Sequence, residues 1–230
     1  MLISLCTPCM NRVDDFVATL PLKIIGANIC PPVEIVTIDY DSQDGLDNYM
    51  YDLMKNSHFD NGSFYTYRKY TGRDTYHAAH ANNLAMLTGS GEYVVLVPAD
   101  VYLERDYLVV LRDRIEKGCV WCNTDRKCRS TIAIKKDVFI EIGGYDERFE
   151  MYGPDDLDLI HRLERHGYKR GSIPNDLVHD VYTSPEKKIE NYRIKGVSHK
   201  ELGKMSMPYY YENEKNGSLV ANVGIEWGKL

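Results

Sequence analysis

The sequence predicts an α/β fold in which a mainly parallel sheet is flanked by helices on both faces. Apolar runs rich in β-branched residues alternate along the chain with segments of helical periodicity, and this alternation is typical of parallel sheets with connecting helices. The length of 230 residues suits a single large domain with a C-terminal extension. The sequence contains no internal repeat or low-complexity tract.

The expected elements follow in chain order. Strands are expected at residues 2–5, 34–38, 65–67, 93–97 and 131–134. Helices are expected at residues 14–25, 46–55, 77–88, 105–116, 136–142 and 155–166. Ligands of such sheets bind beyond the carboxyl ends of the strands. After about Pro174 the alternation ends, and residues 174–230 are too short for a core of their own. We expect this extension to pack on the preceding domain or to close over its ligand.

The charge and hydropathy of the chain argue against several classes of protein. The formal net charge is −6 and the sequence pI is about 5.7, which argues against nucleic acid as a partner because phosphate binding needs a basic surface. The sequence has no run of about 18 apolar residues, so no transmembrane segment is expected. Residues 1–6 lack the basic region of a signal peptide. We therefore expect a cytoplasmic protein, and we leave open whether it forms a homo-oligomer.

Cysteine spacing offers two further kinds of chemistry. Cys6-x-x-Cys9 and Cys119-x-x-Cys122, with Cys128 nearby, have the spacing of zinc ligands. The two pairs are far apart in sequence and Cys6 falls in an expected core strand, which argues against zinc. Cys6 and Cys9 also follow the pattern of a thioredoxin-like redox motif after a strand, and this remains an alternative. In a cytoplasmic protein all six cysteines should be thiols.

A helix with an acidic start is expected at residues 155–166. Pro154 suits the first helical position, where its missing N–H costs nothing. Asp155 and Asp156 then lie in the first turn, where the helix dipole stabilises anions. Asp158 and Arg162 are four residues apart and can pair on one face. One interpretation is that the two first acids only stabilise the helix start.

The residues before this helix favour a functional interpretation instead. Residues 143–149 are GGYDERF, a glycine pair followed by an acidic loop, and residues 152–163 are YGPDDLDLIHRL. A carboxylate at the edge of a cleft can accept a proton from an attacking hydroxyl. The segment resembles the acceptor-site segment of metal-dependent glycosyltransferases, in family 2 and in the C-terminal region of galactosyltransferases. This resemblance implies a GT-A fold, with Asp156 as catalytic base and Asp155 as acceptor-binding residue.

The turn after the first expected strand resembles a donor-binding segment. Residues 7–12, TPCMNR, are similar to the P-T-Y-N-R turn near the start of nucleotide-sugar glycosyltransferases. The resemblance implies nucleotide contacts from Pro8, Cys9, Asn11 and Arg12. The third and fourth positions of the turn differ from the family, so backbone contacts are expected there. A plain strand-to-helix turn capped by Asn11 or Asp14 is the alternative.

Two further segments resemble nucleotide-binding parts of the same enzymes. Residues 39–45, DYDSQDG, are similar to the D-D-G-S-x-D-G segment, which implies that Asp39 accepts the imide N–H of uracil. His80 and Asn83 lie on an expected helix where the family has A-R/K-N, which implies contacts with the nucleotide. A buried polar pair without contact to a ligand is the alternative for these two residues.

The fourth expected strand leads into a metal-binding motif of the family. Residues 93–101, YVVLVPADV, correspond to this strand and the D-x-D motif, with Pro98 in place of the first acid and Asp100 as the second. Mn²⁺ and Mg²⁺ take oxygen ligands and share them with diphosphate and water. The resemblance implies that Asp100 binds the metal and the nucleotide, and that His179 is a second metal ligand. A satisfied core or surface histidine is the alternative for His179.

These segments together predict a GT-A glycosyltransferase. Residues 1–173 would form the catalytic domain, with a nucleotide-binding half at 1–100 and an acceptor-binding half at 101–173. The expected reaction moves a hexose of the Gal, GlcNAc, GalNAc or Glc type from a UDP-sugar to a hydroxyl acceptor, with inversion, in glycan or polysaccharide synthesis. The alternatives are a homologue that binds nucleotide sugars without turnover, which Pro98 favours, and the thiol oxidoreductase.

Overall fold

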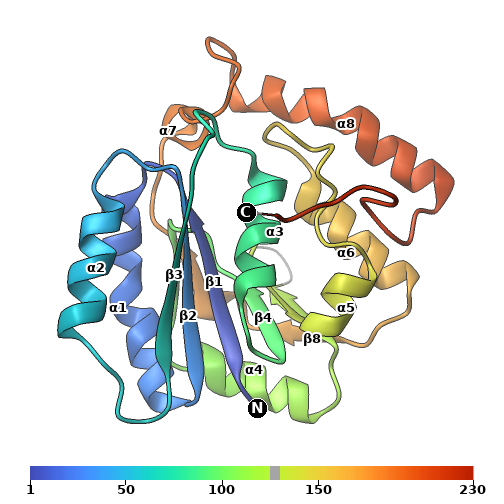
Figure 1. Ribbon diagram of the computed structural model, residues 1–230. Helices are drawn as coiled ribbons and strands as arrows, with labels where there is room; N and C mark the ends of the chain where they lie inside the picture. The colour runs from blue at the N-terminus through green and yellow to red at the C-terminus, as the bar shows by residue number, and fades with distance from the viewer. Residues whose placement is uncertain (125–129, 230) are drawn as a thin grey trace.

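A computed structural model describes residues 1–124 and 130–229 of the chain. Its centre is a seven-stranded sheet with strand order β3-β2-β1-β4-β7-β6-β8 (Figure 1). The strands are β1 (Ile3–Cys9), β2 (Val33–Tyr40), β3 (Phe64–Tyr70), β4 (Tyr93–Leu96), β6 (Trp121–Thr124), β7 (Ile132–Lys135) and β8 (Arg170–Ile173). Only β7 runs antiparallel to its neighbours, β4 and β6, while the other paired strands of this sheet are parallel. The predicted mainly parallel α/β fold is confirmed.

Two hydrophobic clusters cover the two faces of this sheet. One joins the sheet to α1 (Val13–Ile29), α2 (Leu46–Asn56) and α4 (Tyr107–Glu116). The other joins it to α3 (Ala78–Thr88), α5 (Lys136–Glu141) and α6 (Asp155–Arg165). Because both faces are covered, β1 is buried at all seven positions and its sequence is a nearly continuous apolar run.

A small second sheet lies beside the loop that follows β4. It pairs β5 (Val101–Leu103) with β9 (Val178–Asp180) in antiparallel register, so that Val101 lies opposite Asp180. The Val181 N–H also donates to the Asp100 carbonyl at 2.7 Å. The start of the C-terminal extension is thereby attached to the loop that follows β4.

The expected strands and helices all occur, with bounds that differ by a few residues. The elements that were not expected are strands of three or four residues, too short to show a period, and three C-terminal helices. These helices are a 3₁₀ turn (Asn175–Leu177), α7 (Pro185–Ile189) and α8 (His199–Asn216). The start of α8 does have a sequence signature, because Ser198 and Glu201 form a capping box.

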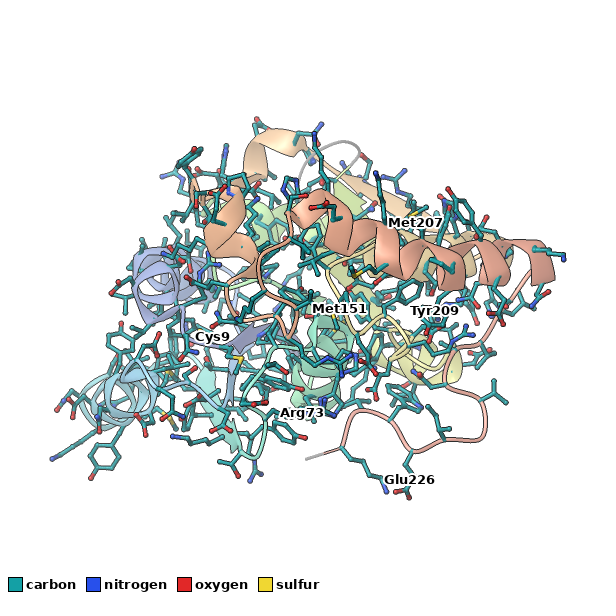
Figure 2. The ribbon with its side chains drawn as sticks, turned by 90° about the horizontal axis from the view of Figure 1, so that it is seen from above. Cys9, Arg73, Met151, Met207, Tyr209 and Glu226 are labelled. Atoms are coloured by element: carbon teal, nitrogen blue, oxygen red, sulfur yellow. The ribbon has the colours of Figure 1, made fainter. Side chains whose placement is uncertain are left out.

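The C-terminal extension packs on the rest of the chain. Figure 2 shows α8, which carries Met207 and Tyr209, crossing the top of the molecule. Asn213 on α8 donates to Asp146 at 3.0 Å and to Asp158 at 2.8 Å, and Arg165 on α6 pairs with Glu214 at 2.6 Å. The described residues of 174–229 therefore contact α6 and the loop before it, while the division at residue 173, the extension as a separate unit and the two halves of the catalytic domain stay predictions. Within the described residues, no helix combines the length and apolarity needed to span a membrane.

Candidate active site

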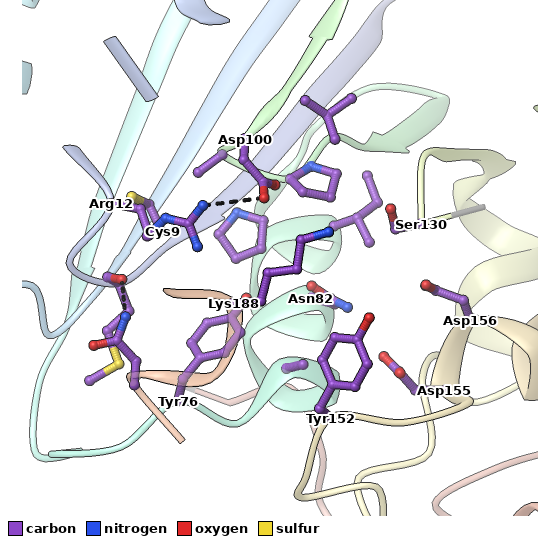
Figure 3. A pocket seen from close by; sticks show the side chains of 18 of the residues that line it. Cys9, Arg12, Tyr76, Asn82, Asp100, Ser130, Tyr152, Asp155, Asp156 and Lys188 are labelled. Carbon is purple, nitrogen blue, oxygen red and sulfur yellow. Dashed lines mark hydrogen bonds and ion pairs between the residues drawn. The ribbon is translucent and has the colours of Figure 1, made fainter. Parts of the chain in front are cut away.

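A cavity of about 360 Å³ lies at the carboxyl ends of β1 and β4 (Figure 3), and we call it the main cavity because most of the predicted site residues line it. Its walls come from the loops after these two strands, from the starts of α3 and α6, and from the extension around α7. Its lining comprises Pro8, Cys9, Met10, Arg12, Tyr76, Ala78, Asn82, Leu96, Pro98, Ala99, Asp100, Val101, Ser130, Tyr152, Gly153, Asp155, Asp156, Asp180, Lys188, Asn191 and Tyr192.

The structure brings most of the sequence-predicted residues to this cavity. Those that line it are Pro8, Cys9, Arg12, Asp100, Asp155 and Asp156. Asn11 lines a second, more open cavity, whose other walls are Met10, Asp41, Gln43, Gly72, Arg73 and Asp74. Because Met10 lines both cavities, they adjoin along the turn that follows β1. Asp39, His80, Asn83 and His179 line neither cavity.

Arg12 connects the turn after β1 to the loop after β4. Its guanidinium donates to the Asp100 carboxylate at 3.2 Å and to the Thr183 hydroxyl at 3.1 Å. Its Nε donates to Asp15. The guanidinium is thus fixed at the cavity wall by three partners, where it can face an anionic ligand.

Asp39 is fully buried at the end of β2. One carboxylate oxygen accepts from the Ser42 N–H at 2.7 Å and the other from the Tyr67 hydroxyl at 2.8 Å. In this conformation Asp39 stabilises the turn after β2. Its role as the acceptor of a uracil imide stays a prediction.

His80 and Asn83 make contacts within the protein. Asn83 is fully buried; its amide donates to the Tyr145 carbonyl at 2.9 Å and accepts from the Tyr145 N–H at 2.8 Å. It also donates to Glu147 at 2.9 Å. His80 Nδ1 lies 2.8 Å from the Tyr40 hydroxyl. Asn83 therefore holds the loop after the glycine pair, and nucleotide contacts of either residue stay predictions.

The glycine pair before this loop is required by close approach of the C-terminal residues. Gly143 and Gly144 have φ angles of +74° and +62°, which side chains rarely adopt. A Cβ on Gly143 would lie 2.2 Å from the Ala221 carbonyl oxygen. A Cβ on Gly144 would lie 2.5 Å from both the Asn83 side chain and the Trp227 ring. Larger residues would separate the extension from the loop.

A buried ion pair fixes α6 against the same turn. The predicted pair of Asp158 and Arg162 is confirmed, with Nε and Oδ2 at 2.8 Å and both side chains fully buried. The Arg162 guanidinium also donates to the Ile142 carbonyl at 2.8 Å and to the Gly144 carbonyl at 2.7 Å. The start of α6, and with it Asp155 and Asp156, is therefore positioned by a rigid network.

Asp155 and Asp156 form a coupled carboxyl pair at the cavity wall. Burial raises the pKa of Asp156 to about 6, although the neighbouring Tyr145 hydroxyl opposes this shift. Burial, and then the charge of Asp156, raise the pKa of Asp155 well above its usual range. Burial of the two adjacent carboxyls therefore favours a shared proton at this end of α6. A carboxylate that titrates near pH 6 is suited to act as a general base at neutral pH.

The two predicted metal ligands do not lie together. Successive side chains of a strand point to opposite sides, so in β9 it is Asp180, not His179, that lines the cavity. His179 stacks on Tyr102 with ring centroids 5.1 Å apart, and its Nε2 lies 2.8 Å from the Asp176 carbonyl oxygen. Among the described residues, no group of three or more His, Cys, Asp or Glu side chains is arranged to hold a metal ion.

Several cavity residues were missed by sequence reasoning. Tyr76 precedes α3 and Asn82 lies within it, Tyr152 follows the acidic loop, and the extension supplies Asp180, Lys188, Asn191 and Tyr192. Tyr152 was visible as an aromatic residue three positions before the acidic pair. The residues of the extension had no sequence pattern, because tertiary packing alone brings them to the cavity.

The geometry does not support thiol chemistry at Cys6 and Cys9. Both residues lie in β1, and they belong to the hydrophobic clusters on opposite faces of the sheet. Burial raises the pKa of both thiols, that of Cys9 to about 12. The dithiol alternative needed an exposed cysteine with a low pKa, so it is wrong for this pair. Cys128 lies outside the described residues.

Comparison with known proteins supports the resemblance to glycosyltransferases. The sequence model of the family described as the N-terminal domain of galactosyltransferase matches residues 126–208. This range contains the glycine pair, the acidic loop and α6. Assignment of that segment to the C-terminal region of galactosyltransferases stays a prediction. None of the curated proteins matches the chain.

The structure is similar to solved glycosyltransferases. Mannosyltransferase PcManGT from Pyrobaculum calidifontis, in complex with GDP-Man and Mn²⁺, aligns with a TM-score of 0.66 and 18% identity over 80% of this chain. TarS residues 1–349 from S. aureus, in complex with UDP, align with a TM-score of 0.64 and 13% identity over 82% of this chain. The chain spans 58% and 62% of these two proteins. It has the fold of GT-A glycosyltransferases, and the resemblance that the sequence indicated is confirmed.

Proposed function

We propose that the protein is a glycosyltransferase that moves a hexose from a UDP-sugar to a hydroxyl acceptor with inversion. The observation that carries this proposal is the position of Asp156. Its carboxylate, with a pKa raised to about 6, lines the same cavity as Arg12 and Asp100 of the expected donor site. A base and a donor site in one cavity are the two parts that a single displacement needs.

The donor would lie along the two adjoining cavities. Its diphosphate would occupy the main cavity near Arg12 and Asp100, and its base would extend past Met10 into the second cavity, near Asn11. PcManGT is described with GDP-Man and TarS with UDP, so a nucleoside diphosphate sugar is the class of donor that the neighbours suggest. UDP is the nucleotide in this proposal because residues 39–45 resemble the uracil-binding segment of the family.

Two carboxylates fit a divalent cation at the diphosphate position. Asp100 and Asp180 line the cavity on adjacent backbone segments, and one or two carboxylates with substrate phosphates are the usual ligands of Mg²⁺. Among the described residues that line the cavity, four are aspartates and two, Arg12 and Lys188, are basic. A bound diphosphate therefore needs added positive charge. Mn²⁺ or Mg²⁺ would neutralise charge on the leaving diphosphate. We propose Asp180 as a ligand beside Asp100, in the place expected for His179.

The residues at the start of α6 would perform the proton transfer. Asp156 would accept the proton of the acceptor hydroxyl as its oxygen attacks the anomeric carbon from the face opposite the diphosphate. The bond from that carbon to the diphosphate oxygen breaks, and the sugar leaves with inverted configuration. Asp155, whose pKa burial raises, would hold an acceptor hydroxyl by a hydrogen bond. The neighbouring Tyr152 ring, partly exposed, would stack on the acceptor sugar.

A screen of donors tests this function. Binding and turnover of UDP-Gal, UDP-GlcNAc, UDP-GalNAc, UDP-Glc and GDP-Man should be measured with Mn²⁺ and with chelator. We expect one of the UDP-sugars to bind and to be hydrolysed slowly without acceptor, because water can replace the acceptor hydroxyl. Binding of all donors without any turnover would favour the non-catalytic homologue that Pro98 suggests. Cytoplasmic location and a role in glycan or polysaccharide synthesis belong to the same proposal.

A further inference from the structure

Lys188 adds a positive charge to the cavity from the C-terminal extension. It lies on α7, and Figure 3 shows its side chain reaching into the cavity. The side chain is exposed. Within the described part of the chain, its Nζ has no hydrogen bond or ion pair. Arg12, by contrast, is already paired with Asp15 and Asp100. The charge of Lys188 is therefore the more available of the two for an anionic ligand.

The backbone that carries Lys188 is attached to the turn after β1 on both sides. After α7, Asn191 donates to the Met10 carbonyl at 3.0 Å and accepts from the Asn11 side chain at 3.1 Å. Before α7, the Thr183 hydroxyl accepts from Arg12 at 3.1 Å. The position of α7 relative to this turn is thus fixed in the unliganded protein, while the long Lys188 side chain stays free to turn towards a ligand.

The adjacent lysine has a different environment. Lys187 Nζ lies 3.2 Å from Asp15, and Lys187 does not line the cavity. Two consecutive residues of the same type and charge therefore differ in one respect that matters, because only Lys188 faces the cavity. Lys187 is a matched control for any effect of net charge or of changes to α7.

We propose that Lys188 binds the phosphate groups of the nucleotide-sugar donor together with Arg12. The inference rests on the proposed function and adds a donor-binding residue from the extension. A diphosphate in this cavity meets the carboxylates of Asp100 and Asp180, and a second cation offsets their repulsion. A charge-assisted hydrogen bond from an ammonium to a phosphate oxygen is strong enough to affect donor affinity. The extension thus contributes to donor binding as well as to packing.

Calorimetry on the full chain tests this role. The variants are Lys188→Met, Lys188→Arg and Lys187→Met, and the probes are UDP, GDP, uridine and guanosine. We expect Lys188→Met to weaken binding of the preferred nucleoside diphosphate by about tenfold to a hundredfold and to leave the phosphate-free nucleoside unchanged. Lys188→Arg should retain most of the affinity, and Lys187→Met should equal the wild type. An effect that is equal for diphosphate and nucleoside would mean a structural role and would overturn the proposal.

The outcomes separate this inference from the proposed function. If the wild type binds UDP or GDP and Lys188→Met binds it equally well, the role of Lys188 is wrong and the glycosyltransferase proposal stands. If the wild type binds neither nucleotide, with or without Mn²⁺, both proposals are wrong. Because Lys188 is exposed and unpaired within the described residues, its replacement should leave the melting temperature unchanged, so loss of folding will not obscure the result.

Discussion

Replacing Asp156 by Asn should lower the transfer rate and raise the stability of the protein. The amide keeps the shape of the carboxylate and cannot accept a proton at neutral pH. Loss of a general base costs on the order of 10²–10⁴ in rate. Donor affinity should change little, because the base faces the acceptor. The same substitution removes a carboxyl group whose pKa the fold raises to about 6.

The stability change can be estimated from that shift. The folded protein binds the Asp156 proton more tightly than the unfolded chain, because burial raises the pKa from its usual 3.8 to about 6, so stability falls as pH rises through this range. This rise in the pKa of Asp156 corresponds to roughly 3 kcal/mol. Partial exposure reduces this figure, and the lost interaction with the helix dipole costs about 0.3–1 kcal/mol. We therefore expect Asp156→Asn to be more stable by about 1–2 kcal/mol at pH 8 and to show less difference at pH 4.

The assay compares Asp156→Asn with Asp155→Asn. Initial transfer rates should be measured with the donor found in the screen, and unfolding should be followed at pH 4 and pH 8. If Asp155 holds an acceptor hydroxyl, Asp155→Asn keeps a hydrogen-bonding group of the same shape in its place, so it should mainly raise the acceptor KM. In the wild type, kcat/KM should fall as pH drops below about 6, since Asp156 must be ionised. Full activity of Asp156→Asn would refute the catalytic role of Asp156. If Asp156→Asn differed from the wild type in stability by the same amount at pH 4 and at pH 8, the raised pKa of Asp156 would be refuted.

Three further predictions concern other residues. Arg162→Met leaves Asp158 buried without its partner and should lower the free energy of unfolding by about 3–5 kcal/mol in urea denaturation; a loss below about 1 kcal/mol would contradict the network. Burial lowers the pKa of Lys23 to about 7, so the unfolded chain binds more protons above pH 7 and stability should rise with pH up to about 10. Lys23→Met should remove this rise and stabilise the protein below pH 7 by up to about 4–5 kcal/mol, and an unchanged slope would exclude the assignment. Mn²⁺ should tighten UDP binding by the wild type but not by Asp100→Ala or Asp180→Asn, with His179→Ala as the unaffected control; equal affinity with Mn²⁺ and chelator in the wild type would rule out the metal site.

Local sequence determined much of the sheet and of the acidic site. The strands β1 and β2 are rich in apolar residues and buried at every position, because both sheet faces are covered. The start of α6 was predictable because Pro154, the adjacent acids and the four-residue spacing of Asp158 and Arg162 are local features. One cavity contains Arg12 after β1, Asp100 after β4, and Asp155 and Asp156 at the start of α6. These ends of the elements meet at the same edge of the sheet.

Tertiary packing decided the contacts between segments distant in sequence. The sequence alone could not show that Asn83 holds the loop at Tyr145, because these residues are 62 positions apart. Similarly, the choice between His179 and Asp180 depends on the side to which β9 presents each residue, which is set by its pairing with β5. A period of two residues makes this choice sensitive to a shift of one position.

The sequence by itself determined the α/β class, most strands and helices, and the acidic segment that indicated a GT-A glycosyltransferase. Periodicity and helix-end chemistry are short-range, so they can be read without a structure. Only the tertiary structure decided that the extension supplies Asp180, Lys188 and Asn191 to the cavity. It also decided that Asp155 and Asp156 have raised pKa values. Both depend on burial and on contacts across the fold, which come from packing rather than from any local pattern.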